Sequence, residues 1–331
     1  MARVESWLVK NGQEVRRGRA PRYFAWDFQL GVQEPTLANT GCFRVPEASL
    51  SNYAGDVTNV AKGEVISGLN ITGTFRPNNQ CTLRDSIIRG GPAPTYGTTH
   101  TLFSARQSGT EAPIRAEYVS ILPSHPSVDV YGFEWGGIDA YRCLITGVVD
   151  GASVHGSGNW PNTIHKSVKF HACMFMDSPY YPTDPRQTDG SHNDFIQAHG
   201  SLSLLEVVGC SFGAVGQRAA ACVLVQQNHG TYSGPIRITD NWFYGHKSKG
   251  AVFNTSESRG QSYTNLEFWR NRIDPESSHA SPAPILVKST SRYPECYGME
   301  GAVGSAPGTW TPGPNANVYM GTGLYVPIKS G

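Results

Sequence analysis

The stretch FHACMF, residues 170–175, decides the fold because its pattern returns along the chain. The pattern has an apolar residue, two variable residues, a small or amide residue, one variable residue and a second apolar residue. The flanking residues alternate between apolar and polar, which indicates strands and not helices. Copies begin at Leu83, Ala140, Phe170, Val207, Ile238 and Phe268, and two looser copies with an aliphatic middle residue begin at Ile66 and Ala116.

These copies are spaced like the turns of a solenoid. Their middle positions lie between 17 residues (69 to 86) and 37 residues (173 to 210) apart. A fixed unit with insertions of variable length is typical of stacked repeats whose turns carry loops. A second short apolar run follows several copies, for example at residues 152–154 and 196–198, and the 37 glycines and 22 prolines of the chain favour many turns. Each turn of the solenoid therefore has at least two short strands.

We expect the middle residue of each copy to face inward at a bend and to stack on its counterparts. Asparagine amides in such a column can bond to one another along the axis. Cysteine thiols fit the same place as small, buried, unreactive groups. A catalytic or redox role for the cysteines is the alternative, but their recurrence at one repeat position favours a structural role. The middle residues are Leu69, Ser86, Val119, Cys143, Cys173, Cys210, Asn241 and Asn271.

Together these motifs carry a resemblance to a known class of proteins. The chain resembles the right-handed parallel β-helix proteins of the pectate-lyase-like class, and more narrowly the β-helical minor tail proteins of phages that infect actinobacteria. The likeness covers residues 36–290. The matching stretches are ANTGCFRVP at 38–46, GEVISGLNITG at 63–73, CTLRDS at 81–86, and SHND at 191–194 followed by Ile196 and Gln197.

The resemblance implies an all-β, right-handed parallel β-helix with a phage function. The expected protein is a minor tail protein, a tail-tip, fibre or spike component of the virion that attaches to the host cell surface and contacts envelope glycan. Its expected partners are other tail proteins, host cell-surface polysaccharide and further copies of the chain, because spikes of this shape are often homotrimers.

The two ends of the chain fall outside the resemblance. Residues 1–35 contain Trp7, Phe24, Trp26 and Phe28, which suit a segment that docks or caps the helix. An open end of a β-helix exposes unpaired backbone groups that need a cover. Residues 291–331 are rich in glycine and proline, and we expect them to pack along the helix or on a neighbouring subunit.

Composition excludes several other classes. A net charge of +1, from 27 basic and 26 acidic residues, gives no electrostatic basis for nucleic-acid binding. No apolar run is long enough for a membrane span, and MARVESWLVKNG lacks the apolar core of a signal peptide, which predicts synthesis in the host cytoplasm. Seven cysteines without a CxxC pair argue against a disulfide framework and a zinc site, so we expect no metal or cofactor.

The stretch DGSHNDFIQAHG, residues 189–200, is the main candidate for a functional surface. It reads as a turn followed by a strand, with Ile196 and Ala198 facing inward and the residues between them facing outward. Aromatic rings beside amide and imidazole groups form the kind of surface that binds sugars. The glycan-binding candidates are Phe195, Gln197, His199, His155, His229, Gln227 and Asn254.

Glycan cleavage is the alternative function. A glycosidase needs two carboxyl groups about 5–5.5 Å or about 6.5–9.5 Å apart, and a polysaccharide lyase needs a base and often Ca²⁺. An acidic group here could host Ca²⁺, although it lacks the EF-hand spacing, and turn capping explains the same residues structurally. A secreted bacterial β-helix enzyme is a third reading, which the missing signal sequence disfavours. The catalytic candidates are Asp177, Asp184, Asp189, Asp194 and His192.

Overall fold

The computed structural model describes residues 34–105, 113–156, 167–184, 186–213, 221–228, 230–243, 253–256, 266–269, 272–273 and 285–287. The chain divides into two compact units, Met1–Glu34 and Pro35–Gly331, and every described strand belongs to the second. The described residues contain one short 3₁₀ helix, η2 (Glu47–Ser49), and no α-helix. Within these ranges no helix has the length and apolar character needed to cross a membrane.

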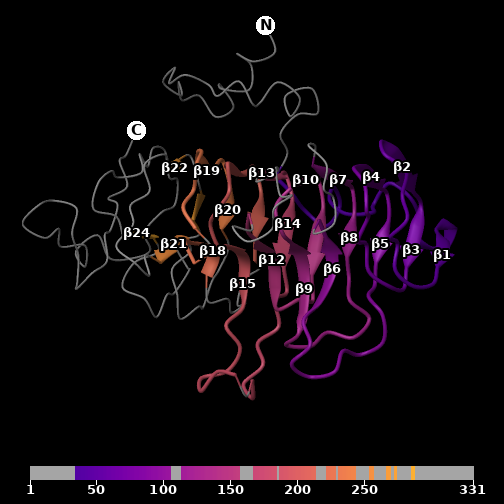
Figure 1. Ribbon diagram of the computed structural model, residues 1–331, viewed down its shortest axis with the longest axis horizontal. Helices are drawn as coiled ribbons and strands as arrows, with labels where there is room; N and C mark the ends of the chain where they lie inside the picture. Colours follow the sequence, from indigo (N-terminus) through magenta and orange to yellow (C-terminus); the bar gives the residue numbers. More distant parts are fainter. Residues whose placement is uncertain are drawn as a thin grey trace, which may run out of the picture. The chain divides into compact units, whose positions relative to one another are not determined.

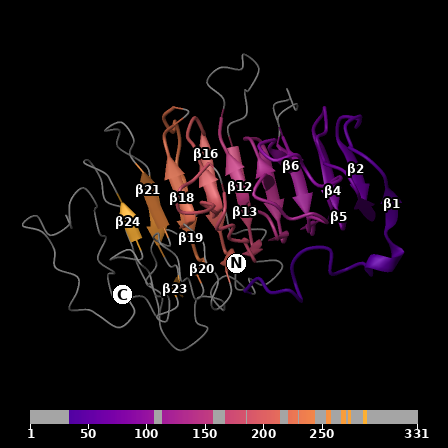
Figure 2. The same cartoon turned by 90° about the horizontal axis from the view of Figure 1, so that it is seen from below.

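The second unit is a right-handed parallel β-helix, which confirms the predicted fold class. From β4 onward, each rung takes one strand from each of three parallel sheets, C, A and B in that order. In Figure 1 the rungs follow one another in sequence order from β1 to β24, and Figure 2 shows the same stack from below.

Sheet C contains β2 (Glu64–Ser67), β4 (Cys81–Arg84), β7 (Ile114–Glu117), β10 (Ile138–Tyr141), β13 (Ser167–His171), β16 (Leu204–Val208), β19 (Ile236–Thr239) and β22 (Leu266–Trp269). Sheet A contains β1 (Ser51–Tyr53), β3 (Leu69–Ile71), β5 (Ile87–Ile88), β8 (Ser120–Ile121), β11 (Leu144–Thr146), β14 (Met174–Met176), β17 (Ser211–Phe212), β20 (Trp242–Phe243) and β23 (Arg272–Ile273). Sheet B contains β6 (His100–Ser104), β9 (Val130–Glu134), β12 (Asp150–Val154), β15 (Asp194–Ala198), β18 (Ala221–Gln226), β21 (Phe253–Ser256) and β24 (Ile285–Val287).

A sharp bend joins each strand of sheet C to the following strand of sheet A. One residue with positive φ makes this bend, for example Arg142 at 53° and Ala172 at 51°. The left-handed conformation is costly for residues other than glycine, so its recurrence marks a position that the repeat requires. The bend residues are Gly68, Asp85, Tyr118, Arg142, Ala172, Gly209 and Asp240.

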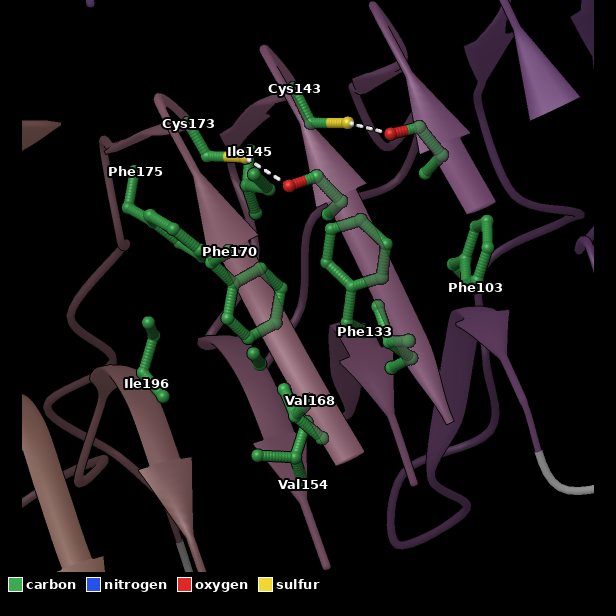
Figure 3. Close-up of a cluster of buried hydrophobic side chains, with 14 of the residues drawn as sticks. Phe103, Phe133, Cys143, Ile145, Val154, Val168, Phe170, Cys173, Phe175 and Ile196 are labelled. Atoms are coloured by element: carbon green, nitrogen blue, oxygen red, sulfur yellow. Dashed lines mark hydrogen bonds between the residues drawn. The ribbon is translucent and has the colours of Figure 1, made fainter. Parts of the chain in front are cut away.

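In the described copies of the sequence repeat, the middle residue comes directly after this bend and is directed into the interior. Leu69 in the first rung is partly exposed, whereas the six that follow are fully buried. Four of them donate a hydrogen bond to a backbone carbonyl of the preceding rung, and Figure 3 shows two of these bonds. The four bonds are Cys143 Sγ to Ala116 O (3.3 Å), Cys173 Sγ to Ala140 O (3.6 Å), Cys210 Sγ to Phe170 O (3.2 Å) and Asn241 Nδ2 to Val207 O (2.9 Å).

The expected bond between the asparagine amides of this column stays a prediction, because Asn271 lies outside the described residues. Towards the preceding rung, Asn241 bonds to backbone groups. Its Oδ1 accepts from the Cys210 N–H at 2.8 Å and its Nδ2 donates to Val207 O. Thiol and amide share the position because both donate to the same kind of carbonyl.

We expect Asn241→Leu to lower the free energy of unfolding by about 2 kcal/mol. Leucine has a similar volume but leaves the buried Cys210 N–H and Val207 carbonyl without partners. Urea denaturation followed by circular dichroism measures the change. Asn52→Leu, at an exposed position of sheet A, is the control and should change stability by less than about 0.5 kcal/mol. Equal effects of the two substitutions would contradict the assigned role.

Phenylalanine rings fill the interior from rung to rung. Neighbouring centroids lie between 4.8 and 5.4 Å apart along this column. Phe212 lies face to face with two rings, Phe175 at 5.2 Å and Phe243 at 4.9 Å. Figure 3 shows part of the column beside the cysteine positions. Its members are Phe75, Phe103, Phe133, Phe170, Phe175, Phe212 and Phe243.

Residues 36–49 form a strap that crosses several rungs on the outside. The first strand, β1, begins at Ser51, directly after the strap. The Gly41 N–H donates to Arg142 O at 2.7 Å, and the Cys42 N–H donates to Ser120 Oγ at 2.8 Å. Gly41 has φ +70°, and a Cβ there would lie 2.4 Å from Ser120 Oγ. Glycine is therefore required for the strap to approach sheet A this closely.

Further contacts hold the middle of the strap. Thr40 Oγ1, which donates to Thr36 O at 2.6 Å, lies 3.8 Å from Met174 Sδ. Four residues further on, Arg44 binds both carboxylate oxygens of Asp85, at 2.8 and 2.7 Å. The strap therefore connects the rung of β14 to the rung of β5.

Charged residues occupy one register position along the outer face of sheet C, and their signs alternate from rung to rung. The row is Arg115, Asp139, Lys169, Glu206 and Arg237. Arg115 Nε lies 3.6 Å from Asp139 Oδ2, and Arg237 Nη1 donates to Glu206 Oε1 at 2.9 Å. Opposite charges in neighbouring strands support the parallel register.

Candidate functional site

The acidic candidates occupy different environments around one inserted loop, residues 177–193, between β14 and β15. Asp177 is exposed and accepts a hydrogen bond from Thr146 Oγ1 at 3.3 Å. Asp189 and His192 form an exposed pair with 2.9 Å between Oδ1 and Nε2. Asp184 and Asp194 are buried. A cleaving pair must contact the substrate from both sides, and these two buried carboxyls do not face solvent.

The Asp184 carboxylate can be buried because it pairs with the guanidinium group of Arg186. Arg186 Nε donates to Asp184 Oδ1 at 3.1 Å and its Nη1 donates to Asp129 Oδ1 at 2.9 Å. Asp129 also accepts from the Gly97 N–H at 3.0 Å, and Tyr96 Oη donates to Asp184 at 3.4 Å. Burial opposes the charge of Asp184, but Arg186 outweighs it and holds the pKa of that carboxyl below its usual value. Arg186 therefore ties together loops from three rungs.

These loops precede β6, β9 and β15 and project on the same side of the second unit (Figure 1). The Arg186–Asp129 pair was not predictable from the sequence, because its members are 57 residues apart and belong to no repeat position. Loops that are tied in this way hold a fixed surface beside the start of sheet B.

The end of sheet B carries a row of half-buried aromatic, imidazole and amide groups, the outer row. The rings of Trp135 and His155 lie 4.2 Å apart, and those of His155 and His199 lie 6.0 Å apart. Ser153 Oγ lies 3.2 Å from His199 Nε2. The outer row consists of Trp135, Ser153, His155, Gln197, His199 and Gln226.

Register explains why the outer row is continuous. Ser153 lies opposite Gln197, and Gln197 lies opposite Leu224. Two residues further along these strands come His155, His199 and Gln226. Gln197 Nε2 donates to Gln226 Oε1 at 3.3 Å, which links β15 to β18. Neighbouring strands of a sheet are about 4.8 Å apart, so the row offers polar and aromatic groups at the spacing of the rungs.

Three of the expected surface residues are therefore brought together, and two others are not. His155, Gln197 and His199 lie in the outer row. Phe195 is only 1% exposed, and its ring centroid is 6.1 Å from that of Phe212. Phe195 and Ile196 both belong to the hydrophobic core, so strict alternation fails at the start of β15.

Gln227 is the second correction. It is 6% exposed, and Gln226 takes the outward position instead. Alternation from the inward-facing Val223 and Val225 was the sequence signal that pointed to Gln226. His229 lies outside the described residues, as does the side chain of Asn254. Trp135 was missed because it follows β9 at an irregular position with φ +77°.

The described part of the chain contains no group of three or more His, Cys, Asp or Glu side chains placed to hold a metal. Comparison of the whole chain with protein-family models, curated proteins and solved structures found no match.

Proposed function

We propose that this chain is a phage minor tail protein that attaches to the host cell surface by binding envelope glycan along the outer row of sheet B. The observation that supports this proposal most directly is a row of neighbouring side chains. Trp135, His155 and His199 lie next to one another, beside Gln197 and Gln226. An indole face covers the apolar face of a sugar ring, while imidazole and amide groups bond to hydroxyls. The outer row combines both at the ends of neighbouring strands of one sheet.

The phage and virion parts of the proposal rest on the resemblance of residues 38–46, 63–73, 81–86 and 191–197. A parallel β-helix is compatible with this assignment and with several others, because one fold hosts many functions. Assembly with other tail proteins and with further copies of the chain, for example as a homotrimer, belongs to the same proposal.

Glycan cleavage has weaker support than glycan binding. Two of the four aspartate candidates are buried under the loops that they stabilise, and Asp189 is paired with His192. The binding proposal therefore predicts retention of polysaccharide without release of reducing ends.

We expect Trp135→Ala to weaken binding to host-envelope polysaccharide about tenfold, because loss of one aromatic contact costs about 1.4 kcal/mol. Isothermal titration with purified polysaccharide fragments measures the affinity, and a reducing-end assay on the same samples measures cleavage. Tyr53→Ala, an exposed aromatic at the first strand of sheet A, is the matched control and should bind like the wild type. Wild-type affinity in Trp135→Ala, or no binding by the wild-type protein, would refute the proposed site.

A further inference from the structure

A half-buried carboxylate, that of Glu134, lies on the outer face of sheet B at the start of the outer row. Glu134 follows Phe133, which Figure 3 shows in the core, and alternation along β9 therefore directs Glu134 outward. Its register partner on β12 is Ser153, a member of the outer row. The repeat pattern in the sequence did not identify Glu134 as a surface candidate.

The backbone at the end of β9 brings this carboxylate to the same face as the indole of Trp135. Successive residues of a regular strand face opposite sides. Trp135 departs from this rule with φ +77°, and its ring lies 4.2 Å from that of His155, two residues beyond Ser153 on the outer face. Such a backbone conformation is costly for tryptophan, and residues held in it often lie at functional sites.

Hydrogen bonds from both neighbouring strands hold the two residues in place. The Ala105 N–H donates to Glu134 O at 3.2 Å, and the Trp135 N–H donates to Ser153 O at 3.2 Å. Thr101 Oγ1 donates to Glu134 Oε2 at 2.8 Å, which orients the carboxylate. A carboxylate and an aromatic ring that are fixed before binding lose little freedom when a ligand arrives.

The Glu134 carboxylate has acceptor capacity beyond its bond with Thr101. An ionised carboxylate accepts at about four lone-pair positions and donates at none, and Thr101 occupies one of them. Neighbouring hydroxyl groups of a sugar are suitable donors for the others. Such bonds to a charged acceptor are roughly twice as strong as bonds between neutral groups, whereas an anionic group of a ligand would be repelled at the same place.

We propose that Glu134 determines the specificity of the outer row, because it accepts hydrogen bonds from the sugar unit that covers Trp135 and excludes units that carry a carboxylate. The ligand class is then an uncharged, polyhydroxylated glycan. The inference rests on the proposed function, since it requires glycan to bind at Trp135. The Ser153 hydroxyl and the Gln197 amide, which lie in register, continue the polar contacts along the row without adding charge.

Isothermal titration tests the proposal with two probes from one source. One is the uncharged fraction of host-envelope polysaccharide fragments, and the other is the same fraction after oxidation of its primary hydroxyls to carboxylates. The wild-type protein should bind the oxidised fragments at least about tenfold more weakly at low salt. This difference should shrink at 1 M salt, where the Debye length is about 3 Å.

Glu134→Gln removes the charge and keeps an acceptor for Thr101. We expect it to bind the uncharged fragments about tenfold more weakly than the wild type, because a neutral acceptor replaces a charged one. It should also lose the salt-dependent preference for uncharged over oxidised fragments. Circular dichroism during thermal unfolding checks that the variant is folded.

Two other variants serve as controls. Glu64→Gln removes an exposed carboxylate from β2 in sheet C, where Oε2 accepts one hydrogen bond, from the Ala61 N–H at 2.8 Å. It changes the net charge equally and should keep the wild-type affinity and preference. Trp135→Ala should weaken the binding of both probes, so loss of the site differs from loss of its specificity.

Wild-type affinity and preference in Glu134→Gln, with weaker binding in Trp135→Ala, would overturn the role of Glu134 and leave glycan binding at the outer row in place. The wild-type protein also gives a result that needs no variant. If it binds the oxidised fragments at low salt as tightly as the uncharged ones, or more tightly, the proposal is wrong. If it binds neither probe, the proposed function fails, and the inference fails with it.

Discussion

Glu206→Gln should lower the free energy of unfolding by about 3–5 kcal/mol. The Glu206 side chain is fully buried on the outer face of sheet C, between Lys169 and Arg237. Arg237 Nη1 lies 2.9 Å from Oε1, while Lys169 Nζ and His171 Nε2 lie 3.9 and 3.4 Å from Oε2. Removing the carboxylate charge leaves the Lys169 and Arg237 cations close together without the anion that lies between them.

The pH dependence of stability should change in the same variant. Burial opposes the charge of Glu206, but His171, Lys169 and Arg237 hold its pKa below the usual value. A lowered pKa contributes stability that is present above the unfolded pKa, about 4.3, and is lost as pH falls through the folded pKa. Urea titrations measure the free energy of unfolding of Glu206→Gln and of the wild type at pH 7 and pH 4. The difference between the two proteins should be smaller at pH 4 than at pH 7.

Glu117→Gln is the control for this prediction. Glu117 is also on the outer face of sheet C and binds Arg84 at 2.6 Å, but both side chains are more exposed. Water screens such a pair, so the expected loss is at most about 1 kcal/mol. If both substitutions lower the free energy of unfolding equally, burial does not determine how strongly Glu206 interacts with Lys169, His171 and Arg237.

Phe212→Ala should cost about 3–5 kcal/mol. Its ring is fully buried and lies face to face with those of Phe175 and Phe243, with interplanar angles of 8° and 10°. Alanine leaves a cavity between two rungs and removes both stacking contacts. In a solenoid each rung is stabilised mainly by its neighbours, so the cavity weakens the junction of β14 with β17 and that of β17 with β20. Differential scanning calorimetry and urea denaturation measure the loss.

Two further variants test whether the loss of stability depends on the buried volume of the Phe212 side chain. Phe212→Leu keeps most of the buried volume and should cost about half as much as alanine. Phe43→Ala removes a ring that is 46% exposed on the strap, and we expect a change below about 1 kcal/mol. A loss at Phe212→Ala no larger than that at Phe43→Ala would show that the ring column does not hold the rungs together.

The rungs were predictable from the sequence because the bend between sheets C and A has the same backbone conformation in every described rung. A left-handed residue such as Arg142 is followed by an inward residue such as Cys143, and this pair recurs at a readable spacing. What the middle residue bonds to was not predictable. The partner of Asn241 is the backbone of Val207 and Cys210, and backbone groups leave no mark in a sequence.

Candidate surface residues were less predictable than the rungs. Alternation places Gln197 correctly but fails for Phe195, because the start of β15 directs two successive side chains into the core. Asp194 stood out by its neighbours in the sequence, while its structural partner Asp150 is 44 residues away. Side-chain clusters that join loops of different rungs depend on the conformation of the inserted loops. The repeat pattern in the sequence does not specify that conformation.

The strap has a consequence for the order in which this chain acquires its structure during synthesis. Thr40 contacts Met174, which is added to the chain 134 residues later, and Cys42 binds Ser120, which is added 78 residues later. While the ribosome is still making those residues, the first rungs can stack but their outer side has no cover. Contacts between such distant residues form late. The strap residues are therefore made before the rungs that they cross, yet they are among the last to reach their final positions.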